Sequence, residues 1–235
     1  MACEQESHWW FMARREILSS VIANIGLKKD ARILEIGCGS GGNLRMLSEH
    51  GGVEATETDK FAREYARNIS GINVQEGSLP DSMAHLEGKF DLVCLFDVLE
   101  HIDQDLQALT AVNKLVKNDG ALLITVPAYQ WLYGPHDKSH HHLRRYSKQE
   151  VMKKSIRANF DIKSISYFNC LLFPVLLITR VIDILFSRND SRGSDKPPPA
   201  INKILYTVFQ FEKRVLKHAK FPFGASIIAT LKIKV

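Results

Sequence analysis

The sequence predicts an α/β protein with a doubly wound, mostly parallel sheet, because three observations agree. A glycine-rich turn, "GCGSGG", follows a short apolar run and precedes a helical pattern. Apolar or β-branched runs then alternate with helical patterns, which is typical of parallel strands covered by helices on both faces. The 235 residues, 45% of them hydrophobic and 24% charged, suffice for one sizeable core in a globular domain.

The individual elements follow from apolar runs bounded by turn residues. The expected strands are Arg32 to Gly37, Val53 to Thr58, Ile72 to Gln75, Phe90 to Phe96 and Ala121 to Val126. The expected helices are Asn43 to His50, Lys60 to Ser70 and Gln104 to Val116. Glycines at 51 and 52 and the sequence Asn118-Asp119-Gly120 predict turns.

Charge is distributed unevenly along the chain. Residues 1–130 carry 12 Lys and Arg against 19 Asp and Glu, whereas residues 131–235 carry 19 against 7. The basic second part predicts an anionic partner, such as a phosphorylated or carboxylated small molecule, a membrane surface or nucleic acid. The four cysteines form no C-x-x-C pair and no secretory leader is recognised, so we expect no disulfide framework, no zinc knuckle and a cytoplasmic location.

The glycine-rich turn satisfies more than one cofactor pattern. Gly37, Gly39 and Gly42 match the dinucleotide fingerprint, and Asp59 follows at the distance expected for a ribose contact. However, Glu35 lies within the preceding strand. A carboxylate there would repel a pyrophosphate but attract a cationic ligand. The glycines alone therefore leave a nicotinamide dinucleotide open, and Glu35 favours a cationic cofactor.

Four motifs in order, "LEIGCGSGGN", "VEATETD", "FDLVCLFDVLEH" and "GALLITVP", resemble those of class I S-adenosylmethionine-dependent methyltransferases. Within that class the chain is similar to a bacterial and archaeal group whose core resembles the ubiquinone-type O-methyltransferases. The resemblance implies a Rossmann-like, seven-stranded sheet with an antiparallel last strand. It also implies S-adenosyl-L-methionine as cofactor, with no particular acceptor.

The resemblance assigns residues to the cofactor in three groups. Glu35 and the turn would hold the methionine amine and carboxylate, with Asn43 capping the next helix. Asp59 would accept both ribose hydroxyls at the end of the second strand, and Ser78 stands where many relatives carry an adenine-binding Asp. The full set of expected cofactor residues is Glu35, Gly37, Cys38, Gly39, Ser40, Gly41, Asn43, Asp59, Lys60, Gly77, Ser78, Leu79, Asp97, Val98 and Leu99. Asp97 could instead cap the following helix.

Methyl transfer to a hydroxyl needs a base, for which histidine is the natural candidate. The candidates are His101, His136 and His142, the last two within "GPHDKSHHHLRRYS". That segment fits a substrate clamp whose arginines grip a phosphate or carboxylate, a metal site, or a solvated basic loop. We favour the clamp and expect no metal. The expected substrate residues are Trp9, Tyr129, Arg144, Arg145 and Tyr146.

The chain ends supply additions to the core. Residues 1–30 are expected to form a helix whose aromatic side chains cover the pocket or pack on the core, residues 31–169 the cofactor-binding core, 170–224 a helical insertion and 225–235 the terminal strand. The apolar run from Cys170 is too short to span a bilayer. Together with the basic segment after it, this run fits either a membrane interface or a homodimer interface.

The function predicted from these patterns is methylation, at oxygen, of an anionic or lipid-linked small molecule. An NAD-dependent oxidoreductase and a methyltransferase-like domain that binds without reacting are the alternatives. A nucleic-acid substrate is not expected, because no N-P-P-Y-like motif for holding a flipped base follows the fourth strand.

Overall fold

The computed structural model describes residues 6–81, 83–178 and 197–234. Its centre is a seven-stranded sheet in the order β3-β2-β1-β4-β5-β7-β6. The strands are β1 (Arg32–Ile36), β2 (Gly52–Thr56), β3 (Val74–Gln75), β4 (Phe90–Phe96), β5 (Val116–Pro127), β6 (Phe160–Phe168) and β7 (Ser226–Ile233). Strands β1 to β5 pair in parallel, and β7 lies antiparallel between β5 and β6. The predicted doubly wound sheet with an antiparallel last strand is confirmed.

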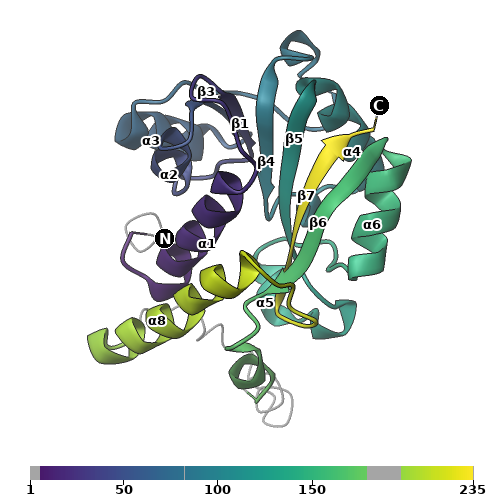
Figure 1. The fold of residues 1–235 in the computed structure, drawn as a ribbon. Coiled ribbons are helices and arrows are strands. Elements are labelled where there is room, and N and C mark those ends of the chain that lie inside the picture. Colours follow the sequence, from purple (N-terminus) through teal and green to yellow (C-terminus); the bar gives the residue numbers. More distant parts are fainter. Residues whose placement is uncertain (1–5, 82, 179–196, 235) are drawn as a thin grey trace.

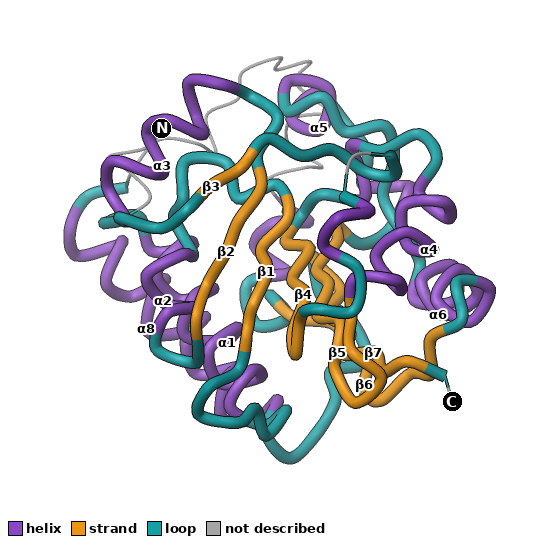
Figure 2. Tube along the Cα trace, turned by 90° about the horizontal axis from the view of Figure 1, so that it is seen from above, coloured by secondary structure: helices purple, strands orange, loops and turns teal. Residues whose placement is uncertain are grey.

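Helices cover both faces of the sheet (Figures 1 and 2). One face carries α4 (Asp105–Leu115) and α6 (Lys148–Arg157). The other carries α1 (Trp9–Ala23), α2 (Leu44–Ser48), α3 (Lys60–Ser70) and α8 (Pro199–Leu216). Neighbouring side chains of the central strands enter opposite clusters: Ile33 packs with α1 and Leu34 with α4. Burial on both faces explains why these strands are apolar runs without alternation.

The turn predicted at Asn118-Asp119-Gly120 is wrong, because these residues remain within β5. The pairing of β4 with β5 slips there, from Phe90 opposite Val116 to Leu92 opposite Ala121. A Cβ on Gly120 would lie 2.7 Å from Val116 Cγ1 and 2.9 Å from the Phe90 carbonyl oxygen. The glycine therefore serves close packing at an irregularity of the strand.

The C-terminal insertion is tied to the core by two residues of α8. Phe209 is fully buried, stacks on Phe168 at 6.2 Å between ring centroids, and meets Trp9 edge-on at 6.0 Å. Glu212 Oε1 accepts hydrogen bonds from the backbone N–H groups of Cys170 and Leu171, at 2.7 and 2.8 Å. Thus α8 holds the start of the insertion against the sheet. Within the predicted helical insertion, residues 171–172 form a turn, residues 173–178 are helical, and residues 179–196 lie outside the described residues.

None of the helices among the described residues combines the length and apolarity needed to cross a membrane.

Three short elements follow the ends of strands β4 and β5: η3 (Leu99–His101), η4 (Gln130–Leu132) and α5 (Pro135–Ser139). The 3₁₀ turn η2 (Ala84–Leu86) precedes β4.

We predict that Phe209→Ala lowers the free energy of unfolding by about 3–5 kcal/mol, because it removes a fully buried ring between α1 and β6. Phe211→Ala on the same helix is the matched control, since that side chain is 51% exposed and its loss should cost less than about 0.5 kcal/mol. Urea unfolding of both variants measures the difference. Equal costs would contradict the docking of α8 described here.

Candidate functional site

The carboxyl ends of the parallel strands meet at one edge of the sheet, where four chain exits adopt left-handed backbone conformations. Gly37 follows β1 with φ +70°, Asp97 follows β4 with φ +57°, Tyr129 follows β5 with φ +63°, and Asn169 follows β6 with φ +55°. Non-glycine residues with positive φ are uncommon and concentrate at functional sites. This edge is also where ligands bind in open α/β sheets.

The glycine-rich turn after β1 leaves space above one of its residues. The N–H groups of Gly37 and Cys38 donate to the Thr56 carbonyl oxygen at 2.8 and 3.0 Å, which fixes the turn against β2. A Cβ on Gly37 would lie 2.9 Å from Val98 Cγ2, so that glycine serves close packing. A Cβ on Gly39 would meet nothing within 4 Å. The open space therefore lies over Gly39.

An acid that the sequence analysis did not single out borders this space. Glu57 is the first residue after β2, and its Oε2 accepts a hydrogen bond from Gly39 N at 2.7 Å. Asp59 was expected at the end of this strand, but it is exposed and is the N-cap of α3, where Oδ1 accepts from Ala62 N at 2.7 Å. Placing Asp59 at the strand end is therefore wrong, because the strand stops at Thr56 and Asp is a favoured N-cap. Lys60 is exposed at the start of α3.

Glu35 is buried at the floor of the turn. Its Oε1 accepts a hydrogen bond from Asn43 Nδ2 at 2.8 Å, and its Oε2 has no partner. Burial, and to a smaller extent nearby Glu57, raises the pKa of Glu35 from 4.5 to about 7, against the lowering effects of Asn43 and Arg14. Asn43 occupies the N-cap position of α2 without a capping bond, so the expectation that it caps this helix is wrong. Its amide holds Glu35 instead.

Arg14 is a site residue that the sequence analysis missed. Although it lies on α1, its Nη2 donates to Asp97 Oδ2 at 2.7 Å and to Thr125 Oγ1 at 2.8 Å. The guanidinium is stacked near Trp10 and Phe96, at 5.1 and 5.6 Å from the ring centroids, and Nε has no partner. Asp97 therefore anchors α1 and does not cap a helix. The signal in the sequence was the spacing Trp10, Arg14, Ile17, which puts Arg14 on the apolar face of the helix.

The segment after β5 forms a buried ion-pair cluster. Asp137 in α5 is fully buried and accepts hydrogen bonds from Arg145 Nε at 2.8 Å and Nη2 at 3.0 Å, from Gly134 N at 2.9 Å and from His142 Nδ1 at 2.9 Å. Burial alone would raise the pKa of Asp137, but the bonds from His142 and Arg145 hold it well below its usual range. The solvated-loop interpretation is therefore wrong for Asp137, Arg145 and Tyr146, although Lys138, Ser139 and His141 between them are exposed.

Two of the residues expected to bind substrate are engaged inside the protein. Arg145 is committed to Asp137, and the Tyr146 hydroxyl donates to Asp105 Oδ2 at 2.8 Å. Both side chains are buried, so their assignment to the substrate is wrong. Arg144 contacts exposed Asp103 at 3.2 Å and buried Asp105 at 3.4 Å, and its substrate role stays a prediction.

The candidate bases separate into two groups. The rings of His101 and His142 meet edge-on with centroids 4.8 Å apart, whereas the His136 ring contacts His140 at 4.3 Å. Glu100 lies close to His101 and His142. One oxygen of its carboxylate and one ring nitrogen of each histidine lie within 4.8 Å of one another. Both Glu100 oxygens lack hydrogen-bond partners, and burial, then Asp97, raises the pKa of Glu100 well above its usual range.

The remaining expected residues line or support this edge. Val98 and Leu99 follow Asp97 in the chain, and Leu79 packs on the same core cluster. Gly77 is buried against Thr56, while Ser78 is exposed.

Burial raises the pKa of the Cys38 thiol, which makes it a poor nucleophile. Tyr129 stacks on Tyr167 at 5.3 Å, and the contact of Trp9 with Phe209 favours core packing over a lid.

The fold and the acid-lined glycine turn define a class I S-adenosylmethionine-dependent methyltransferase. The chain belongs to the family whose model, described as "Methyltransferase domain", matches residues 10–168. Membership implies S-adenosyl-L-methionine as the cofactor. The orphaned Oε2 of Glu35, the orphaned Nε of Arg14 and the open space at Gly39 fit a ligand that carries both an ammonium and a carboxylate group.

Individual relatives are more distant. The Ubiquinone biosynthesis O-methyltransferase of Xanthomonas campestris pv. campestris (strain B100) is 31% identical over 115 residues, covering 46% of this chain and 47% of that protein. The chain thus spans about half the length of that relative. A SAM-dependent methyltransferase structure from Archaeoglobus fulgidus aligns with a TM-score of 0.60 and 14% identity over 93% of this chain and 94% of that one. The cyclase SpnF aligns with a TM-score of 0.60 and 16% identity over 94% and 82%.

Proposed function

We propose that the protein transfers the methyl group of S-adenosylmethionine to an oxygen atom of a small molecule. The observation that carries this proposal is the acidic edge formed by Glu35, Glu57 and Asp97 around the open space at Gly39. An edge rich in carboxylates suits a cofactor with an ammonium and a sulfonium group. Oxygen as the acceptor atom is supported by the similarity to an O-methyltransferase.

Each polar group at the edge has a role in this proposal. Glu57 accepts the ribose hydroxyls, Glu35 faces the methionine ammonium, and Arg14 supplies a cation for the carboxylate. Backbone from Gly37 to Gly41 encloses the methionine, Asp97 to Leu99 border its methyl end, and Gly77 to Leu79 lie towards the adenine. The cofactor supplies an already activated methyl group, so the chain's main task is to align the acceptor with it.

The two alternatives make different demands on the site. A nicotinamide dinucleotide would place its pyrophosphate against the glycine turn, where Glu35 and Glu57 would repel it. The fold is not confined to methyl transfer, since the cyclase SpnF shares it, so a domain that binds the cofactor without reacting is the second alternative. Turnover, rather than binding, separates that alternative from our proposal.

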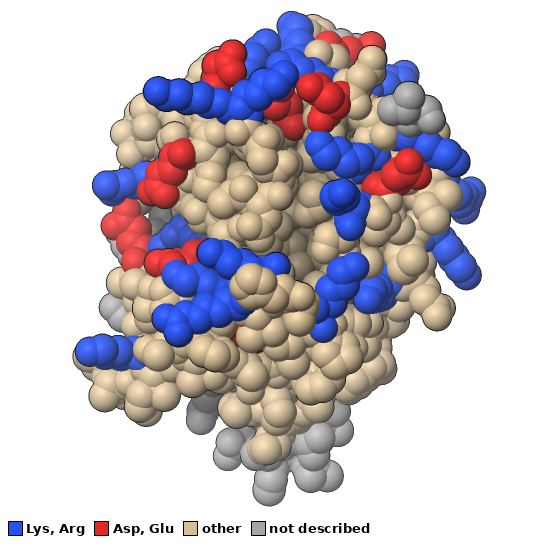
Figure 3. Space-filling model, viewed as in Figure 1, with Lys and Arg blue, Asp and Glu red and all other residues tan. Residues whose placement is uncertain are grey.

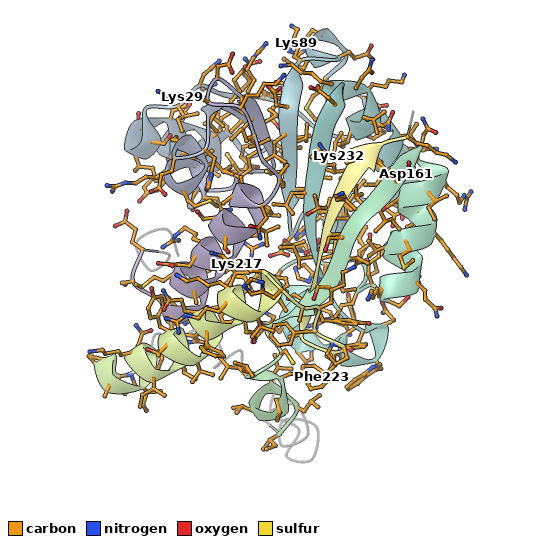
Figure 4. The ribbon with its side chains drawn as sticks, in the orientation of Figure 1. Lys29, Lys89, Asp161, Lys217, Phe223 and Lys232 are labelled. Carbon is orange, nitrogen blue, oxygen red and sulfur yellow. The ribbon has the colours of Figure 1, made fainter. Side chains whose placement is uncertain are left out.

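Of the two acceptor types that the sequence predicts, anionic or lipid-linked, the lipid-linked type is supported by apolar side chains that are exposed at the same edge of the sheet. Leu171, Val175 and Ile178, which follow β6, are 43%, 54% and 61% exposed, and Trp131 after β5 is 67% exposed. Figure 4 shows Phe223 at this end of the molecule, opposite Lys29 and Lys89. Few charged side chains occupy the lower part of the face in Figure 3. This apolar rim suits an isoprenoid tail or a membrane interface, and a homodimer would cover the same side chains.

We predict that Glu57→Gln weakens S-adenosylmethionine binding by about 10- to 100-fold, because a charge-assisted hydrogen bond contributes about 1.5–3 kcal/mol. Asp59→Asn is the matched control and should leave the affinity within about two-fold, because Asn also caps helices well. Isothermal titration calorimetry measures both. If Asp59→Asn lowered the affinity more than Glu57→Gln, Asp59 rather than Glu57 would be the residue that binds the ribose.

We expect the wild-type protein to convert S-adenosylmethionine to S-adenosylhomocysteine with one of three acceptor classes: phosphorylated sugars, quinol precursors or polyprenyl-linked intermediates presented in anionic vesicles. Mass spectrometry of the product locates the methyl group, and oxygen is the expected atom. Tight cofactor binding with no turnover on any acceptor would support the non-catalytic alternative. Turnover confined to soluble acceptors, with no vesicle binding and a dimer in sedimentation, would assign the apolar rim to an oligomer interface.

A further inference from the structure

The contact between Asp137 and His142 fixes which ring nitrogen of His142 carries hydrogen in the neutral ring. Two Arg145 nitrogens and the Gly134 N–H hold the Asp137 carboxylate in place. An ionised carboxylate can only accept hydrogen bonds, so the 2.9 Å contact with Nδ1 requires that nitrogen to donate. Nε2 of the neutral ring is then left as an acceptor.

His142 is also held at its backbone, so the ring has little freedom to turn away. Its N–H donates to the Asp137 carbonyl oxygen at 2.9 Å, and its carbonyl oxygen accepts from the Tyr133 hydroxyl at 2.8 Å. The side chain is 14% exposed, against 0% for Asp137. The carboxylate is thus fully buried, whereas the imidazole still reaches solvent. A base that must contact a ligand needs this partial exposure.

The free side of His142 faces the residues that follow β4. Its ring lies edge-on to His101, and Glu100 lies with both histidines. Glu100 follows Asp97, Val98 and Leu99 directly, and these are the residues expected to border the methyl end of the cofactor. Leu143 N donates to the Glu100 carbonyl oxygen at 2.8 Å, which ties the histidine segment to this exit. The histidine segment therefore lies against the chain exit that, in the proposed function, borders the methyl end of the cofactor.

We infer that His142 is the general base of the reaction and that Asp137 is its positioning residue; the inference rests on the methyl transfer proposed above. As the acceptor oxygen forms its bond to the methyl carbon, the sulfur–carbon bond breaks and its electron pair stays on sulfur, giving the neutral thioether S-adenosylhomocysteine. The hydroxyl proton passes to Nε2 of His142. Asp137 balances the imidazolium charge without taking the proton itself.

Charged and titratable groups face His142 from every side of the cluster. Asp137 stabilises the imidazolium, whereas Arg145 opposes it, and both belong to the same buried pair. His101 and Glu100 approach from η3, and the His140 ring lies 6.0 Å away between centroids. Because the Asp137 carboxylate alone contacts Nδ1 directly among these, it is the group whose removal should change the tautomer.

The test is ¹⁵N NMR of the full-length, histidine-labelled protein saturated with S-adenosylhomocysteine, with His142→Gln used to assign the signals. In the wild type, neutral His142 should show a protonated Nδ1 and a pyridine-type Nε2. In Asp137→Asn the pattern should reverse, because Arg145 and Gly134 hold the amide oxygen and turn the NH₂ group towards the ring. Asp103→Asn, which removes an exposed partner of Arg144, is the control and should leave the pattern unchanged.

Turnover gives a second readout once an acceptor is identified. His142→Gln and Asp137→Asn should each lower kcat by roughly 10²- to 10⁴-fold with little change in S-adenosylhomocysteine affinity. His142→Gln leaves the Asp137–Arg145 pair intact and serves if Asp137→Asn does not fold.

Three outcomes would overturn the inference. They are a wild-type His142 protonated at Nε2, full activity of His142→Gln, or a divalent metal bound stoichiometrically by the wild type and lost in His142→Gln, which would make the ring a ligand. Failure of the wild type to bind S-adenosylhomocysteine would instead contradict the proposed function.

Discussion

Negative charge at the carboxyl edge of the sheet is the constraint on which the rest of the structure depends. Glu35 near the end of β1, Glu57 after β2, and Asp97 and Glu100 after β4 bring four acids to this edge. Burial is the main cause that raises the pKa values of Glu35 and Glu100, and repulsion from Glu57 and from Asp97, respectively, adds to it. Buried carboxylates need protons, hydrogen bonds or cations to persist. The fold supplies one cation here, Arg14, by docking α1 across the sheet, so the N-terminal helix is part of the site.

The same constraint explains why the additions to the core are needed. Arg14 can reach Asp97 only if α1 is held on the sheet, and α8 holds it through Phe209 and through Glu16, which accepts hydrogen bonds from Tyr206 and Gln210. Glu212 in turn fixes the chain as it leaves β6. Residues that look like remote packing therefore determine the position of a cation in the site. A second buried arginine, Arg145, performs a similar task for Asp137.

Local patterns were enough to predict most of the fold. The bounds of β4 and α3 agree with the prediction at both ends. A continuous apolar run defines the strand, while Asp59 caps the start of the helix and Gly71 ends it. Asn118-Asp119-Gly120 was wrongly predicted to be a turn, because the residue types that favour turns also occur at irregularities within strands. The cofactor turn could be located from its glycines, and Glu57 could have been found by asking which of two acids comes first after the strand and which caps the helix.

Other features of the site depend on contacts between residues far apart in the chain. Arg14 and Asp97 are 83 residues apart, and nothing near either residue indicates the other. Arg145 lies in a run of basic residues, which ordinarily indicates an exposed surface, and only the tertiary fold encloses it around Asp137. For the same reason, the sequence offered three candidate bases but gave no means of choosing among them. His142 can be chosen among the three only once the structure shows that the Asp137 carboxylate contacts its ring.

The most direct measurement of this account is the proton released when S-adenosylmethionine binds. Burial raises the pKa of Glu35 to about 7, so below that pH the free protein holds a proton on this group. The ligand's ammonium group stabilises the carboxylate and should expel that proton, so affinity should rise as the pH increases towards about 7. Calorimetry near pH 6.5, in two buffers of different ionisation enthalpy, should show net proton release in the wild type and markedly less in Glu35→Gln. Binding without proton release, or equal release in both proteins, would contradict the account.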